Sequence, residues 1–166
     1  MDLSKIDYWK LIHILIGGLT YLVGVFFLEM LVRLVADWIF RTTAIYGVLA
    51  YEEAQNAYYI IRLGTIYLPS GFFGGLYTGY KIKEKLKLIM MFPSITGFLL
   101  VLIIQYFLGY MTLIISASLL NLAKIIAIPF IVSLSGSYLG GYTINWQVEE
   151  VVEERISLLF EEVKES

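Results

Sequence analysis

Glycine recurs at every fourth position in one apolar stretch of this chain, and this spacing constrains the fold more than any other feature. The stretch is LPSGFFGGLYTGY, residues 68–80, and its glycines Gly71, Gly75 and Gly79 fall on one stripe of a helix. Glycine weakens a helix in water. In lipid, a stripe without side chains lets a second helix approach closely, and association there depends on such packing. The stretch therefore predicts a helix that packs tightly against a neighbour inside a membrane.

The composition agrees with a membrane protein. Of the 166 residues, 59% are apolar and 16% are charged, and the mean hydropathy is +0.78. A soluble domain averages about 45–50% apolar and about 25% charged residues. The chain has no cysteine, which excludes disulfides, thiolate metal sites and thiol nucleophiles. We therefore predict an all-α, multi-pass protein of the cell membrane, with the lipid bilayer as its main partner.

The apolar segments divide into four predicted transmembrane helices, each long enough for the roughly 20 residues that a bilayer requires. Their approximate ranges are 9–38, 63–80, 88–110 and 125–146, and they form a predicted membrane domain over 1–146. Residues 39–62 are too polar to span, so we expect a helix at the outer interface there. We expect 111–121 to be an outer interfacial or re-entrant piece.

Lysines set the predicted topology. The segment KIKEKLK, residues 81–87, joins the second and third predicted spans and carries four lysines. Short loops rich in lysine stay in the cytoplasm, and tryptophans mark the two membrane interfaces. We therefore expect both termini in the cytoplasm, with Trp9 at the inner interface and Trp38 at the outer one.

Similar residues recur at an offset of about 65 positions. The matching pairs include Asn56 and Asn121, Gly71 and Gly136, and Gly75 and Gly140. The offset predicts two repeated hairpins, which would lie parallel and be related by an axis along the membrane normal. Chance matching in such apolar sequence is the alternative.

Small residues on the second and fourth predicted spans form a first candidate site. They are Gly71, Gly75, Gly79, Ser133, Gly136, Ser137, Gly140 and Gly141. One interpretation is helix packing, either between these two spans or with a second copy in a homo-oligomer. The other is that such thin-walled helices line a narrow path through the membrane.

Charged residues near the outer ends of the predicted spans form a second candidate site. They are Glu29, Arg33, Asp37, Glu52, Arg62 and Lys124. Glu29, Arg33 and Asp37 stand four residues apart on one helix, so they either neutralise each other or form an ion or proton site. The sequence carries no nucleophile elbow, phosphate-binding loop, dinucleotide fingerprint or metal-ligand motif. We predict no catalytic residue, metal site or cofactor, and we do not expect an enzyme.

The tail, residues 147–166, is acidic and amphipathic. Seven glutamates against Arg155 and Lys164 give it a charge of −5, whereas the whole chain carries −2. Its apolar residues recur at helical spacing. Anionic lipid repels an acidic helix, so we expect a cytoplasmic helix that docks on the 81–87 loop, on a second copy or on a partner protein. An acidic surface does not suit nucleic acid.

The segments LPSGFFGGLYTGY and SGSYLGGYT resemble those of small glycine-rich multi-pass membrane proteins of unknown function found in archaea. The shared pattern is a proline, glycines every three or four residues, and a closing Gly-Tyr. This resemblance implies four spans in two hairpins and no particular activity. Two functions follow from the residues themselves: a small oligomeric transporter or channel-like protein, or a non-catalytic scaffold or anchor subunit that docks a partner through 147–166.

Overall fold

The described part of the chain is entirely helical in its regular structure. The computed structural model describes residues 8–46, 51–82, 88–109 and 119–144, and every regular element in these ranges is a helix. The predicted all-α class is confirmed for these residues. The predicted acidic helix at 147–166 and most of the 111–121 segment lie outside them.

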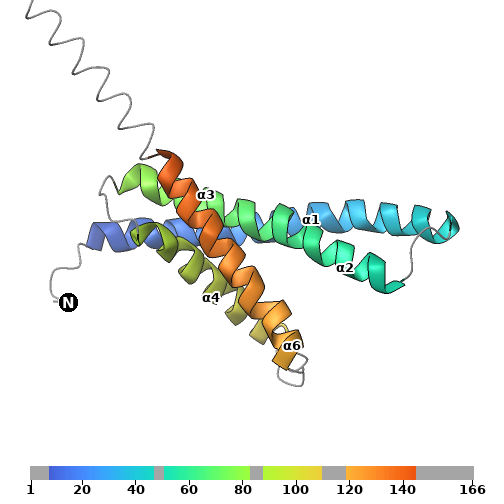
Figure 1. Cartoon of the computed structure of the whole chain (residues 1–166). Helices are drawn as coiled ribbons and strands as arrows, with labels where there is room; N and C mark the ends of the chain where they lie inside the picture. The colour runs from blue at the N-terminus through green and yellow to red at the C-terminus, as the bar shows by residue number, and fades with distance from the viewer. Residues whose placement is uncertain (1–7, 47–50, 83–87, 110–118, 145–166) are drawn as a thin grey trace, which may run out of the picture.

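The first half of the chain forms two long helical segments that lie side by side (Figure 1). The first is α1, Tyr8–Tyr46, with 39 residues. The second starts with α2, Tyr51–Arg62, passes through the π-helical turn η2, Leu63–Tyr67, and continues as α3, Leu68–Lys81. Pro69 directly follows the π-helical turn of this continuous segment, and prolines and π-helical turns are the usual causes of bends within helices. We call α1, α2, η2 and α3 the first arm.

The second half of the chain forms shorter helical elements. A 3-10 turn, η3, Ile89–Met91, leads into α4, Phe92–Phe107. The chain then returns through α6, Leu119–Leu122, the π-helical turn η4, Ala123–Ala127, and a helix over 128–144. We call Ala123–Ile144 the C-terminal span, and α4, α6 and this span together the second arm.

Gly109 ends α4 by its backbone conformation. Its φ of 80° is the left-handed conformation that other residues adopt only with strain. In this position its N–H donates to the carbonyl of Tyr106 at 3.0 Å, and the N–H of Leu108 donates to that of Ile104 at 3.0 Å. These bonds satisfy carbonyl groups that the end of the helix would otherwise leave without partners.

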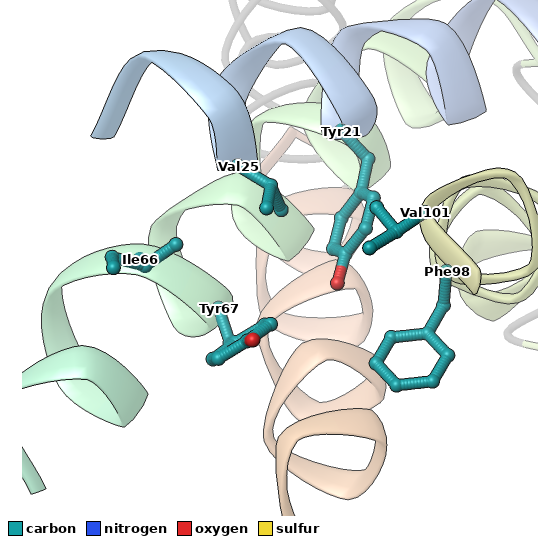
Figure 2. Close-up of a cluster of buried hydrophobic side chains, with 6 residues drawn as sticks. All are labelled: Tyr21, Val25, Ile66, Tyr67, Phe98 and Val101. Atoms are coloured by element: carbon teal, nitrogen blue, oxygen red, sulfur yellow. The ribbon is translucent and has the colours of Figure 1, made fainter. Parts of the chain in front are cut away.

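The two arms meet at one end and diverge toward the other (Figure 1). We call the meeting end the narrow end. There α1 lies against α4, because a Cβ atom added to Gly97 would stand only 2.7 Å from the carbonyl oxygen of Gly18. The core lies between the arms just beyond this contact (Figure 2). Its buried residues are Tyr21, Val25, Ile66, Tyr67, Phe98 and Val101.

The outer surface of the arms is apolar. Val23 and Leu34 on α1 are 65% and 62% exposed, and Phe107 at the end of α4 is 81% exposed. A soluble monomer rarely leaves apolar patches of this extent in water. A bilayer removes that cost, because lipid tails are themselves apolar.

Three helices, and not four, are long and apolar enough to cross a membrane. They are Tyr8–Ala36, Ile89–Phe107 and Ala123–Ile144 within the described residues. Three of the four predicted spans, 9–38, 88–110 and 125–146, therefore have a counterpart. The remaining predicted span, 63–80, does not reach the hydropathy of these three helices. Its glycines, tyrosines, Thr65, Pro69 and Ser70 dilute the hydropathy of the segment, although it is helical throughout.

Candidate functional site

The small residues of α3 and the C-terminal span lie in one contact between the two arms. A Cβ atom added to Gly71 would collide with the backbone of Ser133, and one added to Gly75 would collide with the backbone of Ser137. A Cβ atom added to Gly79 would stand 2.9 Å from the Cα atom of Gly141. All eight predicted small residues are buried. The glycine stripe of α3 therefore packs against the C-terminal span of the same chain.

The contact is reciprocal: glycines of each helix meet the backbone of the other. The residues that correspond on the two helices are 65 positions apart in the chain. A Cβ atom added to Gly71 would lie 3.1 Å from the backbone nitrogen of Ser137, and one added to Gly136 would lie 3.1 Å from that of Phe72. Gly75 and Gly140 show the same correspondence. A Cβ atom added to Gly75 would lie 2.6 Å from the carbonyl carbon of Ser137, and one added to Gly140 would lie 2.8 Å from that of Phe72. Each helix thus presents the same face to the other.

Hydroxyl groups join helices beside this contact: Tyr21 bonds across the two arms, whereas Ser94 and Ser137 bond within the second half of the chain. The Ser133 hydroxyl donates to the carbonyl of Pro129 at 2.8 Å, so the Tyr21 hydroxyl, 2.9 Å away, donates to Ser133. The Ser94 hydroxyl donates to the Ser133 carbonyl at 2.8 Å, and the Ser137 hydroxyl donates to the carbonyl of Met90. In lipid such hydroxyl bonds between helices contribute about 0.6 kcal/mol each on average. These bonds fix how the helices at the narrow end are aligned along their axes.

Toward the wide end, one carboxylate holds two guanidinium groups. Arg62 Nη2 lies 2.8 Å from Glu29 Oε2, and Arg33 Nε lies 3.2 Å from Glu29 Oε1. The side chains of Glu29, Arg62 and Arg33 are 15%, 32% and 71% exposed. The Arg62 guanidinium also lies 5.8 Å from the ring of Tyr58 and 6.0 Å from that of Tyr67. This cluster ties α1 to the end of α2.

Two adjoining cavities lie between the diverging arms, and we call them together the cleft. The first, of about 550 Å³, has Val25, Met30 and Arg62 on the first arm and Ile104 and Leu108 on the second. The second, of about 600 Å³, is more polar. Its polar lining residues are Asn56, Tyr58, Tyr59, Arg62, Tyr67, Gln105, Asn121 and Lys124. Pocket volumes of roughly 300–1,000 Å³ are usual for small-molecule sites.

One hydrogen bond crosses the cleft at its polar side. The hydroxyl of Tyr59 on α2 donates to the backbone carbonyl of Lys124 at 2.9 Å. Lys124 lies in the π-helical turn η4, and its side chain is exposed. The bond sets a definite width for the cleft at this level.

The structure brings together four of the six predicted outer polar residues. Glu29, Arg33 and Arg62 form the ion-pair cluster, and Lys124 stands on the opposite wall of the cleft. The side chains of Asp37 and Glu52 lie outside those that the structure describes. Arg62 pairs with the carboxylate of Glu29, a contact that the spacing along α1 alone could not reveal.

Sequence reasoning missed the tyrosines of the cleft, Tyr58, Tyr59 and Tyr67. Composition counts tyrosine as apolar, and the chain has 13 tyrosines, so their hydroxyl groups gave no distinct signal. Gln105 is an amide within apolar sequence, and it lines both cavities. Its position deep in a predicted span was the usable signal.

The predicted homo-oligomer, the docking of a partner at 147–166, the cytoplasmic termini and the likeness to archaeal membrane proteins stay predictions. In the part of the chain that the structure describes, no three His, Asp or Glu side chains gather as metal ligands would. No family model, curated protein or solved structure matches the chain.

Proposed function

We propose that this chain is a small membrane transport protein and that its solute enters the cleft between the two arms. The observation that supports this proposal is the cleft itself. It has apolar walls and carries Arg62, Glu29 and Lys124 beside its cavities. Polar and ionisable residues that face a cavity among membrane helices commonly mark a solute pathway.

The depth of the ion pair fits such a pathway. Glu29 lies 20 positions after Trp9 on α1, so a helix rise of about 1.5 Å per residue separates them by about 30 Å. That distance equals the usual thickness of the hydrocarbon core. With Trp9 at one interface, Glu29 and Arg62 would stand at the opposite one. The mouth of the cleft would then open to that side, and the narrow end would close the other.

We also propose that α3 crosses the bilayer with the three apolar spans, which would give four. Its less apolar composition is compatible with lipid because its polar and glycine face, Ser70, Gly71, Gly75 and Thr78, is buried against the other helices. Only the remaining face would touch acyl chains. The Thr78 hydroxyl further bonds within the helix, to the carbonyl of Gly74 at 3.0 Å.

The reciprocal contact supports a further proposal, that the chain arose by duplication of a hairpin. Gly71 and Gly136 meet matching atoms of the opposite helix at matching distances. Two similar hairpins joined on a shared face could rock against each other, which is how many transporters expose a site to alternate sides.

The test is flux through purified protein in liposomes, with the cleft held at fixed width. Because the native chain lacks cysteine, a Tyr59→Cys/Lys124→Cys pair can be joined by a short, reducible thiol cross-linker. The probes are carboxyfluorescein released from the lumen and a fluorescent phosphatidylglycerol that moves between leaflets. We expect the unmodified protein to carry at least one probe, cross-linking to abolish the flux of the cysteine pair, and reduction to restore the flux that the pair has before cross-linking.

The matched control places one cysteine only, Tyr59→Cys, with the same reagent, and it should keep its flux. Flux of both probes no faster than in protein-free liposomes would refute the transport proposal. Equal flux in the cross-linked and reduced pair would show that the cleft is not the path.

A further inference from the structure

We infer that the cleft binds an anionic membrane lipid, with the headgroup phosphate at Arg33, Arg62 and Lys124 and an acyl chain in the first cavity. The inference rests on the proposed function, because it names the class of molecule that the cleft would carry. Charge, wall chemistry and access each support it.

The charges that line the cleft favour an anion. Among the described side chains that line the cleft, Arg33, Arg62 and Lys124 are cationic, and Glu29 is the one carboxylate. Glu29 accepts from Nε of Arg33 and from Nε and Nη2 of Arg62. A guanidinium has five N–H donors in a fork that matches phosphate. The carboxylate thus orients both groups and uses only part of their donor capacity.

The first cavity suits a hydrocarbon chain. Its walls come from apolar side chains of both arms, among them Val25, Phe26, Val101 and Ile104. Along α1 the lining residues change from Val25 and Phe26, next to the core, to Glu29 and Arg33 toward the wide end, so the charged groups stand at one end of this cavity. This division into a charged part and an apolar part matches a molecule with a charged head and an apolar tail. A small water-soluble anion would leave the apolar part of the cleft in contact with water.

The cleft is open along its flank to the place where lipid would lie. Phe26, Met30 and Leu108 line the first cavity and are still 46%, 56% and 62% exposed. They belong to, or directly follow, candidate membrane spans. A lipid can therefore enter sideways from the bilayer without first passing through water. Basic pockets between membrane helices are known to bind anionic headgroups.

The first experiment measures lipid retention by native mass spectrometry of the full chain. The protein is exchanged into detergent with equal amounts of phosphatidylglycerol and phosphatidylcholine of the same acyl chains. We expect at least about tenfold more phosphatidylglycerol to be retained, because both lipids offer the same phosphate but the three cations repel the choline cation of phosphatidylcholine. Lys124→Gln and Arg33→Gln should each reduce this preference about tenfold.

The matched control is Lys81→Gln. Lys81 is an exposed cation at the far end of α3 and lines neither cavity. It should leave the preference unchanged. Equal retention of both lipids, or an equal loss in Lys81→Gln and Lys124→Gln, would overturn the inference. Displacement of the lipid by millimolar inorganic phosphate would overturn it too, because a free anion would then account for the site.

A pair of neighbouring variants tests the place of the acyl chain. Ile104 lines the first cavity, whereas Ile103, next to it on α4, is 49% exposed and lines neither cavity. Ile104→Trp should fill the space and lower phosphatidylglycerol retention at least about fivefold. Ile103→Trp should retain it. Equal retention of phosphatidylglycerol by the two variants would show that the acyl chain does not lie in this cavity.

The retention assay tests the lipid site and the flux assay tests transport, so the two proposals can be refuted independently. Selective retention without movement between leaflets would leave the lipid site in place and refute transport. Carboxyfluorescein flux without selective retention would leave transport in place and refute the lipid site.

Discussion

Glu29 and Arg62 are joined by a 2.8 Å ion pair that links the middle of α1 to the last residue of α2. The two residues are 33 positions apart, and both line the first cavity. The pair therefore sets the position of the first arm's inner wall. It also keeps a carboxylate and a guanidinium in a setting that is mostly apolar.

Loss of the carboxylate should destabilise the protein. Glu29→Gln leaves the partly buried Arg62 without its charged partner, and we expect a cost of about 1–3 kcal/mol. Thermal unfolding in detergent measures it. Arg33→Gln is the matched control, because Arg33 is 71% exposed and exposed pairs contribute about 0.2–1 kcal/mol. Equal effects of the two variants would contradict a structural role for the Arg62 pair.

A methyl group on the reciprocal contact should separate the arms. Gly75→Ala and Gly140→Ala each place a Cβ atom against backbone atoms that cannot rotate away, and we expect a loss of about 1–3 kcal/mol for each. The two losses should be similar, because the two sites meet equivalent atoms. Gly64→Ala is the control, since no atom of the other described residues lies within 4 Å of its added Cβ, its own helix backbone and chain neighbours aside. Unfolding by denaturant compares the three variants, and a loss in Gly64→Ala as large as the others would refute the steric explanation.

Gly109→Ala should be costly for a different reason. Among the described residues beyond its chain neighbours, no atom lies within 4 Å of its added Cβ, but its φ of 80° strains any residue with a side chain. We expect a loss of about 1–2 kcal/mol, against little change for Gly64→Ala, which has the same open space without the positive φ. The same unfolding assay applies. No loss at Gly109 would mean that the end of α4 adapts freely.

Tyr21 and Ser133 should be coupled. Tyr21→Phe removes one hydrogen bond and should cost about 0.5–1.5 kcal/mol, whereas Ser133→Ala leaves the buried Tyr21 hydroxyl without that acceptor and should cost about 1–3 kcal/mol. The double variant should cost less than the sum of the two single losses. A double-mutant cycle measures the coupling, and exact additivity would mean that the 2.9 Å contact contributes nothing.

Helical periodicity and hydropathy predicted much of this fold, and the reasons are local. The four-residue spacing of Gly71, Gly75 and Gly79 defines a packing face whatever the rest of the chain does. The apolar lengths at 88–110 and 125–146 likewise required no knowledge of neighbours. The segment 63–80 is less apolar than these two, and a helix that others bury on one face tolerates more polar residues than an isolated span.

The cleft could not be read from the sequence to the same extent. Its ion pair joins Glu29 to Arg62, and its crossing bond joins Tyr59 to Lys124. Both depend on how two arms diverge, which is a property of packing angles and not of spacing along one helix. The sequence predicts that the charged residues lie together near the outer ends of the spans, but it does not predict which residues pair with each other.

The length of α1 has a practical consequence. Its 39 residues make a rod of about 58 Å at 1.5 Å per residue, while the hydrocarbon layer measures about 30 Å. Even at a steep tilt of about 40°, several turns of this rod must protrude into the aqueous phase. An impermeant reagent applied to intact cells can therefore reach one end of α1, which offers a direct way to learn its orientation.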